Sequence, residues 1–261
     1  MELTLVIGML LAVLVGVSLG LLGGGGSILT VPILTYVIGM QPREAIASSL
    51  FIVGATSAAG MYRHAKAQRV RWKTGVTFGA ASMVGAFGGG ITGGYVPGVV
   101  LMVLFALMMV IVATAMIRGR KDPSTAAGQA HLRFSRVALY GLLIGFATGL
   151  VGAGGGFLIV PALNLLGGLP MAVAIGTSLL VIVMNSFAGF AGYLFSVSLD
   201  WPIVLSFTAV AVAGSFFGAK LAGIVPDRLL RKGFGFFVLA MGIFVLSREI
   251  PGLVGSLGIG A

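Results

Sequence analysis

Ten apolar segments follow one another along the chain, with only short loops between them. A transmembrane helix needs about 20 consecutive apolar residues, and most of the segments approach that length. Charged residues make up only 8% of the chain, whereas soluble domains contain about 25%. The sequence therefore predicts an all-α, multi-pass protein of the plasma membrane, with no extramembrane catalytic domain. The segments lie at 3–22, 27–39, 43–62, 74–94, 98–117, 135–151, 156–167, 171–192, 202–223 and 229–247.

Two of these segments, 27–39 and 156–167, are too short to span the membrane as one plain helix. At about 1.5 Å per residue each reaches roughly 20 Å, against about 30 Å for the hydrocarbon core. Each follows a glycine-rich run, 23–26 in the first case and 152–156 in the second. Because glycine interrupts helices, each short helix is expected to begin inside the bilayer.

The chain contains an internal repeat with an offset of 129 residues. Gly16–Leu34 aligns with Gly145–Leu163, and the register continues without a gap, so that Trp72 aligns with Trp201. Agreement over such a length indicates a duplication. We therefore expect a transmembrane repeat 1 over 1–117, a basic cytoplasmic linker over 118–134 and a transmembrane repeat 2 over 135–261.

Lysine and arginine gather in the loops 63–73, 118–136 and 226–232, whereas 94–98 and 193–200 contain neither. Cytoplasmic loops carry an excess of these residues, so the first three loops are expected in the cytoplasm. The same rule accounts for most of the net charge of +10. We therefore expect no nucleic-acid partner, and membrane lipids with anionic head groups are the natural neighbours of these loops.

Equivalent loops of the two repeats have opposite charge bias: 63–73 is basic and 192–202 is not. The repeats are therefore expected to be inverted in the membrane, which requires an odd number of crossings, about five helical segments in each half. In the alternative, the short segments re-enter, each half crosses four times and the repeats are parallel, but the loop charges argue against it. Inverted repeats with paired, interrupted helices are typical of secondary transporters whose site lies near the membrane midplane.

The glycine runs are candidate anion sites. The first N–H groups of a helix have no intrahelical acceptor, and the helix dipole places partial positive charge there. Under inverted symmetry the two short helices would start at one central cavity. The predicted substrate-binding residues of this type are Gly24, Gly25, Gly26 and Ser27 in repeat 1 and Gly154, Gly155 and Gly156 in repeat 2.

Small polar side chains on the next segments are candidate partners for the oxygens of an anion. Hydroxyl and amide groups can bind an anion although they carry no fixed charge. Together with the two helix starts, they would give an affinity for the anion in the micromolar to millimolar range. The competing interpretation is structural, because hydroxyls often bond within their own helix and regularly spaced glycines often serve helix packing. The candidates are Ser48, Ser49, Thr56, Thr177, Ser178, Asn185 and Ser186.

Several classes of function find no support in the residues. The chain has no cysteine and two histidines, so neither a metal site nor a cofactor is expected. All six acidic residues lie at the ends of apolar segments or in loops, which leaves no proton-carrying carboxylate within the membrane. No phosphate-binding Gly-x-x-x-x-Gly-Lys-Ser/Thr motif is present. The protein is thus not expected to be an enzyme, and its transport should be passive or ion-coupled.

The two halves' GLLGGGGSILTVPIL and GLVGAGGGFLIVPALNLLGGLPMAVAIGTSLLVIVMNSFAGF resemble the TauE/SafE sulfite exporter family. The resemblance covers nearly the whole chain. It implies a plasma-membrane transporter, a probable exporter, for small anions such as sulfite or organosulfonates. An anion channel or a membrane scaffold subunit is the alternative, and the oligomeric state is left open.

Overall fold

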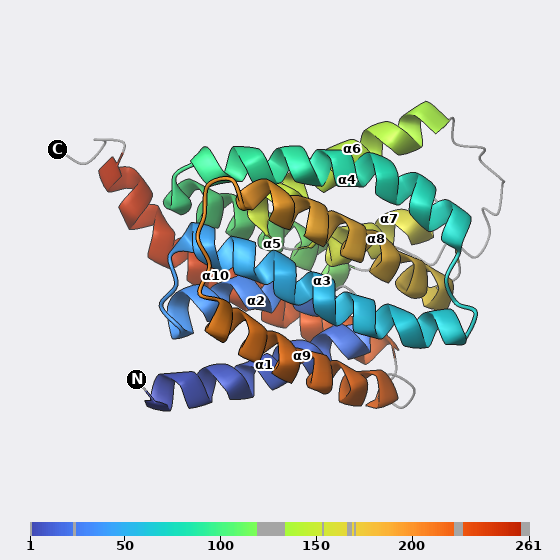
Figure 1. Ribbon diagram of the computed structural model, residues 1–261, viewed down its shortest axis with the longest axis horizontal. Helices are drawn as coiled ribbons and strands as arrows, with labels where there is room; N and C mark the ends of the chain where they lie inside the picture. Colours follow the sequence, from blue (N-terminus) through green and yellow to red (C-terminus); the bar gives the residue numbers. More distant parts are fainter. Residues whose placement is uncertain are drawn as a thin grey trace.

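The structure, a computed structural model, describes residues 2–22, 25–118, 134–152, 154–165, 169, 171–221 and 227–256, and this part of the chain is helical without a strand. All ten predicted segments coincide with helical elements, and an all-helical fold is confirmed (Figure 1). Repeat 1 contains α1 (Glu2–Leu22), a short segment built from η1 (Gly25–Leu29), α2 (Thr30–Pro32) and η2 (Ile33–Val37), then α3 (Pro42–Lys66), α4 (Trp72–Tyr95) and α5 (Gly98–Arg118). Repeat 2 contains α6 (Phe134–Val151), α7 (Gly156–Leu165), α8 (Met171–Tyr193), α9 (Trp201–Leu221) and α10 (Asp227–Ser256).

Prolines fix several of these boundaries. Pro42 is the first residue of α3, where its missing N–H costs nothing, and Gln41 before it is extended with ψ 145°. Val96 ends α4 in an extended conformation with ψ 139°, as expected for the residue before Pro97. At the start of α9, Ile203 N donates to Asp200 Oδ1 at 3.4 Å. These helix boundaries therefore have local steric and hydrogen-bonding causes.

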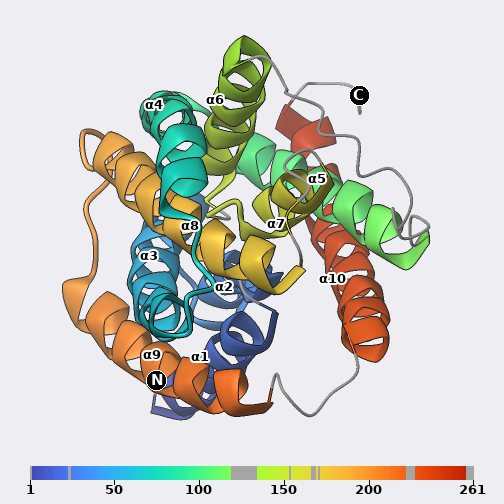
Figure 2. The same cartoon turned by 90° about the vertical axis from the view of Figure 1, so that its right-hand side faces the viewer.

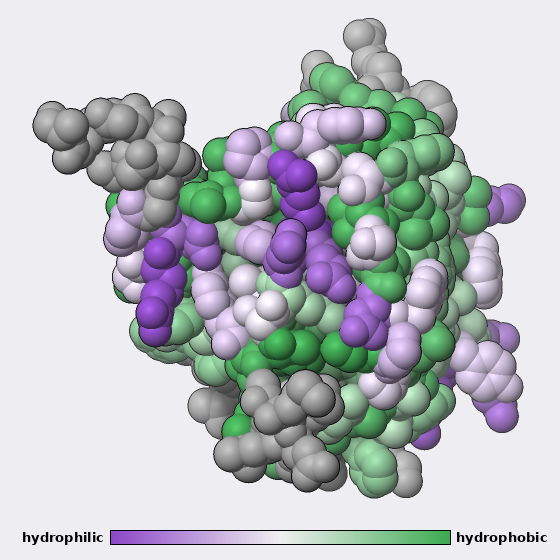
Figure 3. All heavy atoms as spheres, turned by 60° about the vertical axis from the view of Figure 1, so that its left-hand side comes forward, coloured by the Kyte–Doolittle hydropathy of each residue, from purple (hydrophilic) through white to green (hydrophobic). Residues whose placement is uncertain are grey.

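Three of the described helices are long and apolar enough to cross a membrane, namely Pro42–Lys66, Val173–Tyr193 and Trp201–Gly218. Large apolar side chains such as Leu10, Val84 and Phe217 are exposed on the outside of the bundle. Figure 3 shows hydrophobic residues over much of the visible surface and hydrophilic residues gathered in limited areas. Such a surface suits contact with lipid.

The helix α10 is longer than predicted and continues to Ser256. Glu249, which the sequence places at the end of an apolar segment, therefore lies within a helix and accepts a hydrogen bond from Tyr36 Oη at 2.7 Å. The expectation that all acids lie at segment ends or in loops is wrong for this residue. Hydropathy marks where apolar residues stop, whereas a helix continues as long as its backbone bonds form.

The two repeats interlock. At the offset of 129 residues each helix of repeat 1 corresponds to one of repeat 2, and Trp72 and Trp201 are both first residues of their helices. α4 packs against α6, and the equivalent pair, α9 and α1, packs in the same manner. α3 contacts its own counterpart α8, and α5 contacts α10. The bundle is thus assembled mainly from contacts between repeats, as Figures 1 and 2 show.

Equivalent turns lie at opposite ends of the bundle. In Figure 1 the turn between α3 and α4, which carries Arg69 and Arg71, is on the right. The equivalent turn between α8 and α9 is on the left. Of the predicted linker 118–134, residues 119–133 lie outside the described part of the chain.

Regularly spaced glycines allow the interlocked helices to approach closely. A Cβ atom on Gly145 of α6 would overlap the carbonyl oxygen of Ser82 on α4. At the equivalent contact, a Cβ atom on Gly16 of α1 would overlap the carbonyl oxygen of Ala211 on α9. These glycines serve helix packing, as their spacing indicates.

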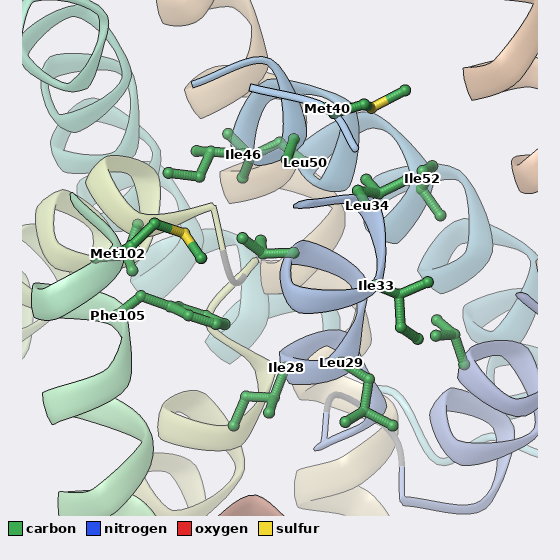
Figure 4. Close-up of a cluster of buried hydrophobic side chains, with 14 of the residues drawn as sticks. Ile28, Leu29, Ile33, Leu34, Met40, Ile46, Leu50, Ile52, Met102 and Phe105 are labelled. Carbon is green, nitrogen blue, oxygen red and sulfur yellow. The ribbon is translucent and has the colours of Figure 1, made fainter. Parts of the chain in front are cut away.

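The short segment of repeat 1 is embedded in apolar side chains. Ile28 and Leu34 are fully buried, and Leu29 and Ile33 are 3% and 6% exposed. Figure 4 shows them together with Met102 and Phe105 of α5, which belong to the same cluster of buried side chains. The first short segment therefore lies in the core of the bundle.

Candidate functional site

The glycine run before α7 forms a left-handed turn. Gly152, Gly154 and Gly155 have φ angles of +77°, +60° and +77°, a region that residues with a Cβ atom rarely adopt. α7 begins directly afterwards at Gly156. The N–H groups of Leu158 and Ile159 both donate to Gly155 O at 2.9 Å, so the helical hydrogen bonds begin at this glycine. We call Gly152, Gly154, Gly155 and Gly156 the glycine turn.

Side chains from three helices surround the glycine turn. A Cβ atom on Gly154 would lie 2.6 Å from Val53 Cγ1 of α3 and 2.9 Å from Ser186 Oγ of α8. A Cβ atom on Gly155 would lie 3.1 Å from Thr148 Oγ1 of α6. The turn is therefore buried. Because its glycines have no Cβ atom, the hydroxyl groups of Ser186 and Thr148 can approach its backbone.

One predicted site residue fixes the glycine turn to the other repeat. Ser49 Oγ of α3 donates to Gly152 O at 2.8 Å, and both residues are buried. This hydrogen bond joins residues 103 positions apart in the chain. Ser49 thus positions the turn. Its hydroxyl proton is used in this hydrogen bond and is not available to a ligand.

Three predicted site residues, Asn185, Ser186 and Ser48, have a buried polar atom with no partner among the described residues. Ser186 Oγ and Asn185 Oδ1 have no hydrogen-bond partner among the described residues, and their side chains are 0% and 1% exposed. The other end of the Asn185 amide is used, because Nδ2 donates to Ser82 Oγ at 2.6 Å. Leaving a buried polar atom unpaired costs about 1–3 kcal/mol, so such atoms in a native protein need an explanation.

The run of repeat 1 takes a different conformation from that of repeat 2. Gly24 lies outside the described residues, while Gly25, Gly26 and Ser27 open a 3-10 turn rather than an α-helix. A single α-helical turn and a π turn complete the segment, with Ile38 N donating to Ile33 O at 3.1 Å. The expectation of an equivalent helix start in each half is therefore wrong in its geometry.

Close packing explains why the glycine at 26 is needed. A Cβ atom on Gly26 would lie 2.6 Å from the carbonyl carbon of Ser18 and 2.8 Å from Ser18 Cβ on α1. This glycine therefore allows the backbone to approach α1. Its counterpart Gly155 instead adopts a left-handed φ angle.

Most of the other predicted hydroxyls have partners within the fold. Thr56 Oγ1 donates to Ile52 O at 2.7 Å and Ser178 Oγ to Ile175 O at 2.8 Å, both within their own helices. Thr177 Oγ1 accepts from Arg71 N at 3.0 Å and so holds the turn between α3 and α4. Nine residues, about 13 Å of helix, separate Thr177 from Ser186. The structure thus does not bring Thr177 to the glycine turn.

Ser48 remains the other predicted residue with a free hydroxyl. Its Oγ has no partner in the described part of the chain, and its side chain is fully buried. Ser57 and Ser186, which align with each other in the two repeats, also have hydroxyls with no partner among the described residues, although only Ser186 was a predicted site residue.

The sequence did not single out Ser82 or Thr148. Ser82 is fully buried and receives the hydrogen bond from Asn185, and Thr148 contributes the hydroxyl next to Gly155. Both are polar residues inside long apolar segments, a signal that was available. The prediction relied on polar residues that occur at aligned positions in both repeats. Ser82 and Thr148 do not meet this condition, because they align with Ala211 and Leu19.

The two short segments meet in the interior of the bundle, where η1 contacts α7. Figure 2 shows α7 beside α8, against which it packs. Among the described residues no group of three or more histidine, cysteine or acidic side chains could hold a metal ion. The polar groups that the described residues bring to the glycine turn are its own backbone groups and the hydroxyls of Ser49, Ser186 and Thr148.

An open groove lies elsewhere, at the C-terminal end of α3, lined by Tyr62, Arg63, Lys66 and Ala67. There Arg63 Nη1 donates to Phe216 O at 3.1 Å, and its guanidinium lies 5.6 Å from the centroid of the Phe216 ring. The groove belongs to the basic end of the bundle and not to the glycine turn.

Known proteins resemble this chain over most of its length. The model of the family described as "Sulfite exporter TauE/SafE" matches residues 8–245. No solved structure matches the chain.

Three relatives are each described as a probable membrane transporter protein. One from Xylella fastidiosa is 38% identical over 246 residues, which cover 92% of this chain and 94% of the relative. One from Methanocaldococcus jannaschii is 28% identical, covering 90% and 94%. One from Haemophilus influenzae is also 28% identical, covering 90% and 95%. With its apolar helices and these relatives, the protein is a multi-pass membrane transporter, and the chain belongs to the TauE/SafE sulfite exporter family.

Proposed function

We propose that the protein is a secondary transporter, working as an exporter, for small anions such as sulfite or organosulfonates, and that it binds them at the glycine turn. One observation carries the proposal: Gly154 and Gly155, both with left-handed φ angles, directly precede α7, and the buried Ser186 Oγ next to Gly154 has no partner among the described residues.

The glycine turn has the physical properties of an anion site. Backbone N–H groups in left-handed turns and in the first turn of a helix form concave sites for anions. The start of α7 adds the positive end of its dipole, worth about 0.3–2 kcal/mol. Hydroxyl and amide groups supply hydrogen bonds of about 1 kcal/mol each. A site without a fixed charge releases its anion readily, as a transporter must.

We further propose that the two repeats are inverted in the membrane, with five crossings each. The opposite positions of the α3–α4 and α8–α9 turns in Figure 1 support this, as does the restriction of Arg69 and Arg71 to one of them. The basic end would face the cytoplasm. Movement of one group of helices against the other would then expose the glycine turn alternately to the two sides.

The membrane potential is sufficient to drive export. A negative interior favours the exit of an anion by about 2.3 kcal/mol per charge for each 100 mV. Export by this route requires no coupling ion.

Efflux from proteoliposomes tests the proposal. Sulfite and methanesulfonate efflux would be measured with and without an imposed potential for the native protein, for Asn185→Ala and for the control Thr77→Val. Thr77 is exposed on α4, and its hydroxyl donates to Lys73 O of its own helix. Saturable, potential-sensitive flux that is weakened in Asn185→Ala alone is the expected result. No flux of either anion above that of empty vesicles would overturn the proposal, and flux without saturation or counterflow would indicate a channel.

A further inference from the structure

The groove at the C-terminal end of α3 combines two cationic side chains with a phenol. It is lined by Tyr62, Arg63, Lys66 and Ala67, and its volume of about 460 Å³ lies within the range of about 300–1,000 Å³ that is usual for small-ligand sites. α3 contacts α9 in the bundle, and Figure 2 looks onto the end at which both helices finish. The groove is therefore large enough to hold a molecule of its own.

One of the two cations is fixed in place by α9. Arg63 Nη1 donates to Phe216 O at 3.1 Å, and its guanidinium lies 5.6 Å from the centroid of the Phe216 ring. A guanidinium has five N–H donors, so this hydrogen bond leaves others for an anion. Lys66 is exposed and makes no hydrogen bond or ion pair within the described part of the chain. The groove thus holds one positioned cation and one without a partner.

No acidic residue of the surrounding segments balances this charge. In α3, in α9 and in the turn 67–71 the only acid is Glu44, which lies in the first turn of α3. Nineteen residues, about 28 Å of helix, separate Glu44 from Arg63. The groove is therefore complementary in charge to an anionic ligand.

The surroundings of the groove suit lipid rather than water. Tyr62 is exposed beside it, and Phe216 and Phe217 are exposed on α9. Trp72, the first residue of α4, is exposed at the same end. Tyrosine and tryptophan are enriched at the level of the lipid head groups, whereas exposed phenylalanines on an apolar helix suit acyl chains. The two cations therefore border an apolar surface, as a phospholipid head group borders its acyl chains.

The equivalent helix contact at the other end of the bundle carries no charge. At the offset of 129 residues α3 and α9 correspond to α8 and α4, which also contact each other. Gly192 and Phe195 stand there in place of Arg63 and Lys66. A Cβ atom on Gly192 would lie 2.6 Å from Phe87 O, the counterpart of the carbonyl that Arg63 binds, and the Phe87 and Phe195 ring centroids lie 6.3 Å apart. Glycine and two rings pack this contact at one end, and cations line a groove at the other.

We propose that the groove binds an anionic phospholipid, whose phosphate accepts hydrogen bonds from Arg63 and Lys66 and whose acyl chains lie along Phe216 and Phe217. Basic pockets between transmembrane helices at the cytoplasmic side bind anionic head groups, and the cytoplasmic leaflet is rich in such lipids. The site differs from a general attraction of lipids to basic loops because a neighbouring helix holds one of its cations. It is separate from the glycine turn and from the transported anion.

Lipid titration of the purified protein in detergent tests the proposal. Native mass spectrometry would measure the binding of phosphatidylglycerol and of phosphatidylcholine with the same acyl chains, so that the head group is the only difference. A basic residue near anionic head groups contributes about 1 kcal/mol, or about fivefold in affinity. With two such residues, we expect the first phosphatidylglycerol to bind at least about tenfold more tightly than phosphatidylcholine.

Three variants assign this selectivity to the groove. Lys66→Gln should lower the affinity for phosphatidylglycerol about fivefold and leave the melting temperature without lipid unchanged. Arg63→Gln should lower the affinity at least as far, and it should also lower the melting temperature because the bond to Phe216 O is lost. The matched control is Lys73→Gln, since Lys73 is an exposed base on α4 at the same end but outside the groove. Its affinity should stay within about twofold of the native value.

Each contrary result identifies another role for these residues. Equal affinity for the two lipids, or an equal loss in Lys66→Gln and Lys73→Gln, would overturn the proposal in favour of general attraction to basic loops. Glycerol 1-phosphate and sulfite serve as soluble probes, and displacement of phosphatidylglycerol by either would show that the groove holds a soluble anion. A lower melting temperature of lipid-free Lys66→Gln with unchanged lipid affinity would assign Lys66 to the dipole of α3. The comparison of the two lipids uses the native protein, so it holds even if a variant fails to fold.

Discussion

The two short segments have closely similar sequences and different conformations. In repeat 1 the segment passes through a 3-10 turn, one α-helical turn and a π turn. In repeat 2 a left-handed glycine turn precedes ten residues of regular helix. The aligned pairs are Gly26 and Ser27 against Gly155 and Gly156. Gly26 allows close packing against α1, whereas Gly155 supplies a positive φ angle. A duplicated motif can therefore keep its glycines while their physical role changes.

The largest effect is expected from Gly154→Ala. The native φ angle of +60° disfavours alanine by about 1–2 kcal/mol, and the new Cβ atom would lie 2.6 Å from Val53 Cγ1. We expect transport to be lost and the melting temperature in detergent to fall by several degrees. Native-like transport by this variant would show that the glycine turn is not the site.

Two glycine controls separate backbone strain from overlap. Gly39 has a φ angle of +84°, and no atom of the described residues lies within 4 Å of its Cβ position, so Gly39→Ala should destabilise the protein without abolishing transport. Gly60 lies within the helix α3, and a Cβ atom there would be 3.7 Å from Leu179 Cδ1, an ordinary contact distance. The free energy of unfolding of Gly60→Ala should therefore be unchanged or rise by about 0.5–1 kcal/mol.

The second comparison concerns the aligned residues Asn185 and Thr56. Asn185→Ala removes an amide whose Oδ1 has no partner among the described residues, whereas Thr56→Val removes a hydroxyl that bonds within its own helix. We expect kcat/KM for sulfite efflux to fall about tenfold, or roughly 1.4 kcal/mol, in the first variant. The fall should be under about twofold in the second. Equal losses would indicate that both halves contribute a binding site.

The third comparison concerns Ser186 and its counterpart Ser57, whose hydroxyls are both buried without a partner in the described structure. Ser186→Ala should raise KM about three- to tenfold because a charge-assisted hydrogen bond to the anion is lost. Ser57→Ala should leave KM unchanged. Both variants should melt no lower than the native protein, since an unpaired buried polar atom is removed. A raised KM in Ser57→Ala would extend the site into repeat 1.

The smallest effect distinguishes Ser49 from Ser178. Ser49→Ala breaks the hydrogen bond to Gly152 O between the repeats and should cost about 1 kcal/mol in the free energy of unfolding. Ser178→Ala breaks a bond to Ile175 O within one helix and should change stability by less than about 0.5 kcal/mol. Denaturant titration in detergent measures both. Equal costs would mean that Ser49 does not hold the glycine turn in place.

Hydropathy was sufficient to predict where the ten helical segments of this fold lie. Apolar segments reveal membrane helices directly, and Pro42 and Pro97 mark boundaries through local sterics. The extension of α10 past Glu249 was missed because hydropathy does not report backbone hydrogen bonding outside apolar segments. For the same reason the contact between Tyr36 and Glu249 was not foreseen.

The candidate site was predicted only in part, because the partners of a hydroxyl depend on tertiary packing. Within the described part of the chain, Asn185 and Ser186 each have an unpaired polar atom, whereas the hydroxyls of Thr56 and Ser178 bond within their own helices. No local sequence pattern separates the two pairs. Ser82 lies on another helix and becomes relevant only once α4 packs against α8. The conformation of each glycine run likewise depends on what its backbone packs against.

The glycine turn has an evolutionary consequence. Under the proposed function, the backbone N–H groups of the turn bind the anion. A side-chain substitution does not remove these groups as long as the turn keeps its conformation. Discrimination between anions would instead reside in Asn185 and Ser186, which are adjacent in the chain. Descendants of one ancestral transporter could then exchange cargo through point mutations in two neighbouring codons while they inherit the same anion-binding frame.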